Sequence, residues 1–298
     1  MYQNSFNLSA SESLLAFIHI EKTAGETMKW ILRSSFGISH CDISSDNVFK
    51  PLLSRQLSKI EKIYPFLQSI AGHPVTPYMN LDTASRSIQY FTFLREPRKQ
   101  CASYFQYLAV TLKMYPVNQF DEWIRTEWPR NMQTKRLCGA ANAQKAIEMI
   151  CEKKIFAGLT EQFDESIFLL KQLVQPDLSL GYNMRNLAPD NTIAIKLLRD
   201  ERTRSLIEDA VSEDLKLYHW VKNELFPHYV HLYTQRTGMS LPKSFSFKSE
   251  NYRRLHVLIN RLYRNIIYRP LEMAIVRNQR PLRKRSFRVL HLNNRLST

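Results

Sequence analysis

The sequence predicts an α/β protein built on a parallel β-sheet that is flanked by helices on both faces, and two observations support this prediction. Short apolar runs rich in Phe and Ile alternate with stretches of helical spacing from residue 14 to about residue 235. Such alternation is typical of parallel sheets covered by helices. Two of the runs pass into a helix through a basic turn. Because ligands bind beyond the carboxyl ends of parallel strands, we expect both turns at one ligand-binding edge.

The first unit, residues 14–32, contains a strand, a polar loop and a helix. Residues 14–20 are too short and too rich in Phe and Ile to favour a helix, so they predict a buried strand. The helix is expected to begin at about Thr27. A helix N-terminus presents unpaired N–H groups and the positive end of the helix dipole, which suits a phosphate. The unit is therefore P-loop-like, although it lacks the G-x-x-x-x-G-K spacing of ordinary ATP-binding loops.

The second basic turn, residues 95–98, follows a predicted strand over residues 88–94. Pro97 is placed to start the next helix. The other predicted elements are helices over residues 52–67, 120–128, 143–151 and 164–175, strands over residues 154–159 and 191–198, a polar connection over residues 131–139, and a largely helical stretch over residues 206–233.

The formal net charge of +15 is unevenly distributed. From Lys243 onward, 14 Lys and Arg accompany two acidic residues, whereas the rest of the chain holds 28 basic and 25 acidic residues. Residues 255–267 repeat apolar side chains at helical spacing with arginines between them, which predicts a basic amphipathic helix. We therefore divide the chain into a flexible tail (1–12), one domain (13–237) and a basic amphipathic helical extension (238–298).

The basic extension is open to three interpretations: a helix packed on the domain with a solvated basic face, a helix that docks on an anionic membrane surface, or a holder of an acidic glycan acceptor. Nucleic acid is not expected as a partner, because no recognised binding module or stacking platform is present. The N-terminus lacks the features of a signal peptide and no apolar run is long enough to span a membrane. We expect a cytoplasmic protein, peripheral to the membrane if the extension binds lipid.

Four cysteines, Cys41, Cys101, Cys138 and Cys151, are irregularly spaced and form no C-x-x-C pair. Neither they nor the histidines show the spacing of metal ligands. We expect reduced thiols and no metal site.

Four short motifs follow one another along the predicted domain. Residues 19–27, HIEKTAGET, resemble the pattern K-T-x-G-T-T/S after a strand. Residues 92–108 resemble a strand followed by R-D/E-P, with Ser103 eight residues after Arg95. Residues 158–166, GLTEQFDES, and residues 214–218, DLKLY, complete the set. In this order they resemble the PAPS-dependent sulfotransferases, in particular the bacterial relatives of the carbohydrate group that includes the heparan sulfate 2-O-sulfotransferases.

This resemblance implies transfer of a sulfuryl group from PAPS (3′-phosphoadenosine 5′-phosphosulfate) to a hydroxyl of a saccharide or glycolipid. It implies that Lys22 stabilises charge at the bridging oxygen of the phosphosulfate, and that Arg95 and Ser103 bind the 3′-phosphate, for which a guanidinium fork is well suited. No metal is required. The residues that would wrap the 5′-phosphate, largely through backbone N–H groups, are Lys22, Thr23, Ala24, Gly25 and Thr27.

The general base has two candidates. The carbohydrate members of the family carry a base histidine in a G-H pair between the two phosphate segments, and His73 follows Gly72 there. A histidine has an ordinary pKa of about 6.5, suited to this role. Glu161, at a strand end on the ligand edge, is the other candidate.

One residue of the first loop departs from the family pattern. Glu26 stands where the family usually has threonine. A carboxylate beside a phosphate weakens binding unless it points outward or caps a backbone N–H. The alternatives are therefore a non-catalytic nucleotide- or membrane-binding protein of the same fold and, disfavoured by the loop spacing, an ATP-dependent kinase.

Overall fold

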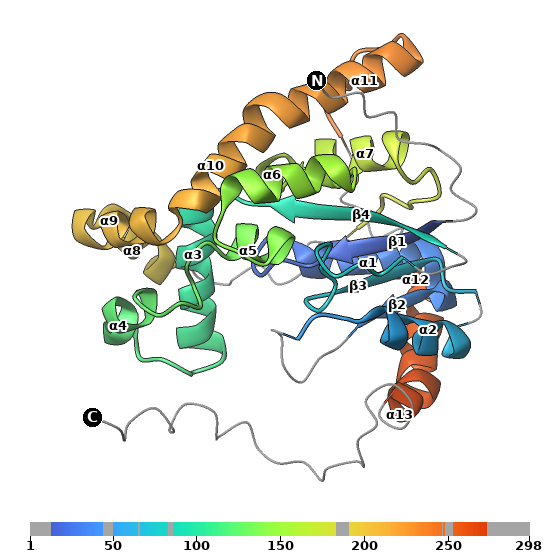
Figure 1. Cartoon of the computed structure of the whole chain (residues 1–298), viewed down its shortest axis with the longest axis horizontal. Coiled ribbons are helices and arrows are strands. Elements are labelled where there is room, and N and C mark those ends of the chain that lie inside the picture. Colours follow the sequence, from blue (N-terminus) through green and yellow to red (C-terminus); the bar gives the residue numbers. More distant parts are fainter. Residues whose placement is uncertain are drawn as a thin grey trace.

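The structure is a computed structural model of the 298-residue chain, and it describes residues 13–43, 50–64, 66–82, 86–182, 191–245, 247 and 253–272. The described strands form one five-stranded parallel sheet in the order β2-β3-β1-β4-β5 (Figure 1). This confirms the predicted α/β class. The strands are β1 (Ser13–Ile18), β2 (His40–Asp42), β3 (Ser69–Gly72), β4 (Ser87–Leu94) and β5 (Phe156–Leu159).

The register of the central strands brings the two basic turns to the same edge. Ile18 at the end of β1 lies opposite Thr92 in β4 and Gly72 in β3. The Thr92 hydroxyl donates a hydrogen bond to the Ile18 carbonyl, at 2.9 Å. Because β1 and β4 end next to each other, the loops that follow these two strands are also adjacent.

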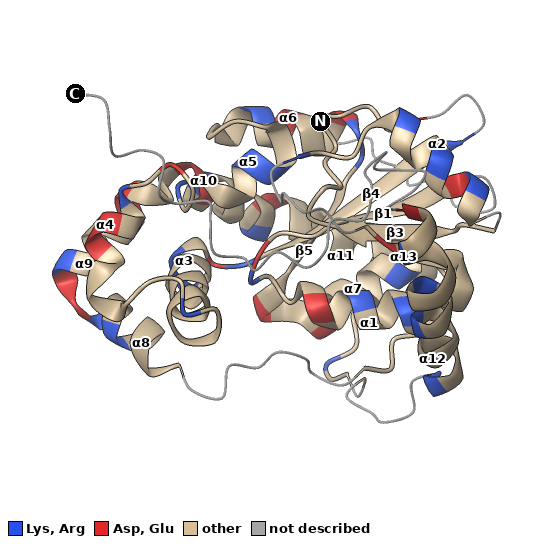
Figure 2. Ribbon diagram, turned by 90° about the horizontal axis from the view of Figure 1, so that it is seen from below, with Lys and Arg blue, Asp and Glu red and all other residues tan. Residues whose placement is uncertain are grey.

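Helices cover both faces of the sheet, as predicted. In Figure 2, α1 (Gly25–Phe36) and α7 (Phe163–Leu173) lie on one face, and α2 (Ser54–Ile63) and α6 (Ala143–Glu152) lie on the other. Met28, Ile31 and Leu32 of α1 are fully buried. Because strands β1 and β4 are covered on both faces, their sequences are continuous apolar runs rather than alternating ones.

A second group of helices extends beyond the carboxyl ends of the strands, around α3 (Pro97–Gln106) at the left of Figure 1. Its small core joins Phe105, Phe120 and Trp123 to Leu197 and Ile207. A long helical segment, residues 212–237, then runs from this group back over one face of the sheet (Figure 1). The elements are η2 (Tyr107–Thr111), η3 (Val117–Gln119), α4 (Phe120–Ile124), α5 (Met132–Cys138), η4 (Thr160–Gln162), α8 (Thr192–Arg199), α9 (Glu201–Ala210), α10 (Ser212–Trp220), η5 (Val221–Leu225) and α11 (Phe226–Thr237).

Two predictions of local structure are wrong. A strand was predicted over residues 191–198, but residues 192–199 form helix α8, because Ala194 and Leu197, three residues apart, pack into the small core beside α3. The Ala194 N–H donates to the Gln106 side chain of α3, at 2.9 Å. Residues 131–139 contain helix α5 instead of a polar connection. The Asp214 carboxylate accepts hydrogen bonds from the first-turn N–H groups of α5, at 2.9 and 2.8 Å.

The last described segment comprises α12 (Arg254–Tyr263), η6 (Arg264–Tyr268) and α13 (Arg269–Leu271), and α12 packs beside α1 and η1 (Gly37–Ser39). Asn260 Nδ2 donates to the carbonyls of Gly37 and His40, both at 2.8 Å. The Tyr263 hydroxyl donates to the Ile63 carbonyl, at 2.6 Å. Within the predicted extension, the described helical residues are 254–271. The predicted tail over residues 1–12 and residues 273–298 lie outside the described residues.

Candidate functional site

A cavity of about 510 Å³ opens at the carboxyl ends of β1, β4 and β5. Its volume lies in the range of small-molecule sites. The cavity is built from the loop after β1, the start of α1, one face of α3 and the start of α7. The predicted site residues that line it are Lys22, Ala24, Gly25, Thr27, His73, Arg95, Ser103 and Glu161. Thr23 does not line it, because its side chain is fully buried beneath the loop.

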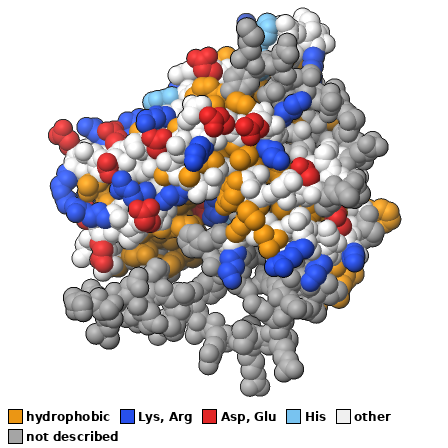
Figure 3. All heavy atoms as spheres, viewed as in Figure 1, with side chains coloured by type: hydrophobic (Ala, Val, Ile, Leu, Met, Phe, Trp, Pro, Cys, Tyr) orange, Lys and Arg blue, Asp and Glu red, His pale blue; other side chains and the backbone are white. Residues whose placement is uncertain are grey.

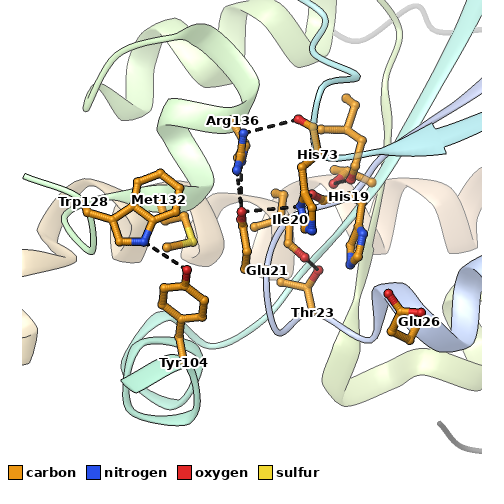
Figure 4. A network of polar contacts seen from close by, with 12 residues as sticks. His19, Ile20, Glu21, Thr23, Glu26, His73, Tyr104, Trp128, Met132 and Arg136 are labelled. Atoms are coloured by element: carbon orange, nitrogen blue, oxygen red, sulfur yellow. Dashed lines mark hydrogen bonds and ion pairs between the residues drawn. The ribbon is translucent and has the colours of Figure 1, made fainter. Parts of the chain in front are cut away.

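The loop after β1 is held by side chains that bind four consecutive carbonyl groups. The carbonyls of His19 and Ile20 accept from His73 Nδ1 at 2.8 Å and from the Thr23 hydroxyl at 3.0 Å (Figure 4). The next two carbonyls, of Glu21 and Lys22, accept from the side chains of Gln100 at 2.9 Å and Arg95 at 3.1 Å. These bonds occupy the four carbonyl groups and fix the course of the loop.

The same loop contains two residues in the left-handed region. Lys22 has φ 62° and Ala24 has φ 63°, and neither is glycine. Such backbone costs about 1–3 kcal/mol per residue and persists only where its surroundings enforce it. Helix α1 begins directly afterwards, at Gly25. Its first-turn N–H groups have no acceptor within the helix, so the helix start is suited to an anion.

Two cationic side chains reach the cavity from the two basic turns. Lys22 Nζ lies 4.8 Å from the centre of the Tyr107 ring. Burial lowers the pKa of Lys22, and the nearby Arg95 guanidinium lowers it further. The two positive charges repel each other. An anion bound at either side chain would offset this repulsion and favour the charged form of Lys22.

Arg95 is positioned through its backbone. The Gln133 side chain accepts from the Arg95 N–H at 3.1 Å and donates to the Arg95 carbonyl at 2.9 Å. Gln133 lies at the start of α5, whose N–H groups bind Asp214. Burial raises the pKa of Asp214 to about 6, although these N–H groups favour its charged form. Sequence analysis missed Gln133 because it lies on an element that was not predicted to be a helix.

His73 presents an unprotonated nitrogen at neutral pH. The His19 carbonyl can only accept a hydrogen bond, so Nδ1 of His73 carries the proton and Nε2 is left as the basic atom. Burial lowers the pKa of His73 below its ordinary value, against the opposing effect of the Glu21 carboxylate. The ring is half-buried and lines the cavity. Its environment thus favours the neutral form that a general base requires.

The His73 ring is stacked on His19, with ring centres 4.2 Å apart. His19 is buried, and its Nδ1 has no hydrogen-bond partner among the described residues. The other side of His19 lies against Gly25, where an added Cβ would be 1.9 Å from the imidazole ring. Gly25 is therefore required by close packing, and its φ is not in the left-handed range.

A buried ion pair between Glu21 and Arg136 lies next to His73, and sequence analysis missed it. Arg136 of α5 binds both carboxylate oxygens of Glu21 and donates to the His73 carbonyl at 3.3 Å (Figure 4). Burial alone would raise the pKa of Glu21, but His73 and the Arg136 guanidinium hold it below its ordinary value. The Glu21 carboxylate also lies 3.4 Å from His73 Nδ1. The pair connects the first loop, the histidine and α5.

Glu161 lines the cavity with both of its carboxylate oxygens engaged. One accepts from the Glu96 N–H at 2.9 Å, and the other accepts from the Tyr218 hydroxyl at 3.1 Å. Glu161 therefore connects the second basic turn to α10. The segments 158–166 and 214–218, noted in the sequence as motifs, meet through this contact.

The segment over residues 158–166 also has a packing role. The Ser166 hydroxyl accepts from the Leu159 N–H at 2.9 Å and donates to its carbonyl at 3.2 Å. A Cβ on Gly158 would lie 2.9 Å from both the Phe93 ring and Ser166. Gly158 and Ser166 thus let α7 approach the ends of β4 and β5.

Glu26, the residue that departs from the sulfotransferase pattern, is paired. Its carboxylate lies 2.5 Å from Lys29 Nζ, one turn along α1, and its side chain is 37% exposed. In Figure 4 it lies apart from the network around Glu21. Acidic side chains also line the α7 side of the cavity, where Asp164 accepts from the Tyr182 hydroxyl at 2.5 Å. Lys22 and Arg95 line the side of the cavity that the two basic turns form, where Glu21 and Glu26 also contribute to the lining.

Within the described ranges, no group of three or more His, Cys, Asp and Glu side chains could hold a metal ion. In the same part of the chain, no helix has the length and apolar character needed to cross a bilayer. Comparison with known proteins finds no family model and no curated protein that matches this chain.

Proposed function

We propose that this protein is a PAPS-dependent sulfotransferase that acts on a hydroxyl of a saccharide or glycolipid. One observation carries the proposal: a single cavity collects Lys22, Arg95, Ser103 and His73 at the start of α1. A nucleotide with phosphates at both ends needs two anion sites, and Lys22 of the first turn and Arg95 of the second would each contribute to one of them. Neither turn has the spacing of an ordinary ATP-binding loop.

The donor set fits such a nucleotide. The start of α1 and Lys22 would hold the 5′-phosphosulfate end, and Arg95 with Ser103 would hold the 3′-phosphate. The bound donor supplies a sulfuryl group attached to a phosphate that can leave as an anion. Lys22 would stabilise the negative charge that develops on that phosphate. Preorganised charge of this kind is worth most in a site shielded from water.

His73 is the base that the geometry favours. Its Nε2 is unprotonated at neutral pH, so it can accept the proton of an acceptor hydroxyl. The His19 carbonyl and Glu21 orient the ring from the Nδ1 side. Glu161 is better suited to bracing the second turn, because both of its oxygens already accept hydrogen bonds.

The pairing of Glu26 with Lys29 supports catalysis over the non-catalytic alternative. The concern with Glu26 is an uncompensated negative charge beside the 5′-phosphate. Its carboxylate is instead compensated by an adjacent ammonium group. Lys22, which the chemistry requires, stands in the cavity.

A thermal-shift titration tests the nucleotide class. Adenosine 3′,5′-bisphosphate should stabilise the protein, by about 2.7 kcal/mol at a concentration of 100 times Kd. ATP with magnesium should stabilise it far less. Stabilisation by ATP alone would favour a kinase, and no shift with the bisphosphate would refute the proposal.

The acceptor would be identified by screening. Tyr104 and Tyr107 are the aromatic side chains of α3 and η2 that line the cavity. A panel of glycans and glycolipids would be incubated with labelled PAPS, with His73→Asn as the inactive control. Label transferred equally by the wild type and the variant would contradict the role given to His73.

A further inference from the structure

Helix α12 and its continuation carry a stripe of large apolar side chains on the surface. We define the α12 stripe as Leu255, Leu258, Leu262 and Ile266, which are 64%, 51%, 49% and 69% exposed. Their spacing of three and four residues places them on one face of the helix. Isolated exposed leucines are common on proteins, but a contiguous apolar stripe indicates an interaction surface.

The orientation of this helix is fixed by polar contacts on its inner face. Val257 and Asn260 are buried, and Asn260 donates to two backbone carbonyls. His256 Nδ1 lies 3.1 Å from the Ser34 carbonyl, and Tyr263 binds the Ile63 carbonyl. These contacts hold an asparagine inward and the leucines outward. Turning the helix to bury the stripe would break all of them.

The charged side chains around the stripe are of one sign. Arg253, Arg254, Arg261 and Arg269 are exposed, whereas the single acidic residue of the segment, Glu272, is buried. Figure 2 shows blue and no red along α12. Over the helices at the left of Figure 3, by contrast, acidic and basic side chains are interspersed. In sequence, residues 273–298 add seven Lys and Arg and no acid.

We propose that residues 254–271 form a docking surface for an anionic lipid bilayer. The helix would lie in the plane of the membrane, with the α12 stripe inserted at the boundary of the acyl chains and the arginines on the headgroups. Amphipathic helices with an apolar face and a cationic rim bind membranes in this way. Each arginine near an anionic bilayer adds to the electrostatic attraction.

Charge favours a lipid surface over the other occupants. A second copy of this chain would bring a second arginine rim against the first, and like charges repel. Residues 273–298 are themselves basic, so they would also be repelled by the rim. A bilayer with anionic headgroups complements both the charge and the linear apolar shape.

The surface is independent of the proposed chemistry. Helix α1 has its first residue, Gly25, at the cavity, while α12 contacts its last turn and the residues that follow. A helix of this length separates its ends by about 18 Å. Docking would therefore leave the cavity open to solvent, and membrane binding can be tested without any assay of turnover.

Vesicle co-sedimentation of the full chain tests the proposal. Binding is expected to vesicles that contain phosphatidylglycerol, to weaken at high salt, and to be much weaker to phosphatidylcholine alone. The double variant Leu258→Ser/Leu262→Ser should lower the affinity at least about tenfold, because two leucines are no longer buried. The matched control is Leu112→Ser/Ile195→Ser, two side chains that are 46% and 45% exposed elsewhere. Circular dichroism would establish that each variant is folded.

A second pair of variants tests the charge. Arg254→Gln/Arg269→Gln should weaken binding and its salt dependence, whereas Lys196→Gln/Arg199→Gln, which removes the same charge from α8, should not. If the two double variants bind vesicles with equal affinity, binding depends only on net charge, and the proposed docking surface is wrong. Light scattering tests whether the stripe binds a second copy of the chain instead. If the wild type is a dimer that does not bind vesicles, and Leu258→Ser/Leu262→Ser is a monomer, the stripe is a dimer interface and the proposal is wrong.

Discussion

The two ends of α1 differ in which side chains near them are buried and which are exposed. At its first residue, charged groups are withdrawn from water: Glu21 and Arg136 are paired beneath the loop, and four side chains bind four consecutive carbonyls. At its last turn, α12 places Asn260 inward and the α12 stripe outward. Burying a charge is costly unless it is paired and hydrogen-bonded, and a contiguous exposed apolar patch indicates an interaction site. The difference therefore indicates a rigid chemical site at one end and a contact surface at the other.

The largest effect is expected from breaking the buried pair. Glu21→Gln leaves the Arg136 guanidinium buried without its carboxylate, which should lower the free energy of unfolding by about 3–5 kcal/mol. Glu127→Gln is the control, because this carboxylate is 89% exposed where it pairs with Lys135. It should cost about 0.5 kcal/mol or less. Urea denaturation measures both, and equal losses would show that the Glu21 pair is not a buried brace.

Removing the ammonium group of Lys22 should affect catalysis more than stability. Lys22→Met keeps the aliphatic chain over Tyr107 and should lower the turnover of sulfate transfer about 10²–10³-fold, as loss of one charge-stabilising donor does. Lys99→Met on the exposed side of α3 is the control. A Lys22→Met variant with wild-type turnover would assign the lysine to the loop structure alone.

Removing the buried side-chain amide of Asn260 on α12 should lower stability more than removing the exposed amide of Asn265 on η6. Asn260→Ala leaves the carbonyls of Gly37 and His40 without their donor and should cost about 1–3 kcal/mol. Asn265→Ala on the exposed side of η6 should change stability by less than about 0.5 kcal/mol. Thermal denaturation compares the two. Equal effects would mean that the orientation of the helix is not set by Asn260.

The smallest expected effect is a shift in pH dependence. Burial lowers the pKa of His73, so its neutral form persists to lower pH than that of an ordinary histidine. Turnover should stay constant from neutral pH to below about 6.5 and fall only as pH drops through this lowered pKa. A rate that already falls above that value would mean that the base is another group or that His73 is more solvated.

The predictable parts of the fold were those with a strong local signal. The apolar runs of β1, β4 and β5 predicted strands, and Lys22 and Arg95 were found because each follows a strand end. Strands β2 and β3 were not predicted, because they have three and four residues and depend on pairing such as His40 opposite Ser69. The apolar run at residues 191–198 resembled a strand locally, and only its packing beside α3 makes it a helix.

The supporting residues of the site could not be found from sequence. Glu21 and Arg136 lie 115 residues apart, and Gln133 reaches Arg95 from an element whose first turn depends on Asp214. Each of these contacts arises only when distant segments fold together. Sequence patterns found the groups suited to the chemistry, and the structure added the groups that hold them.

Calorimetric titration gives the most direct test of the central claim, that the cavity binds a nucleotide phosphorylated at both ends. Adenosine 3′,5′-bisphosphate should bind at least about tenfold more tightly than adenosine 5′-monophosphate, because only the former engages Arg95 and Ser103. In Arg95→Gln the difference should largely vanish while binding of the monophosphate persists. Equal affinities for the two nucleotides in the wild type, or a difference unchanged in the variant, would contradict this account.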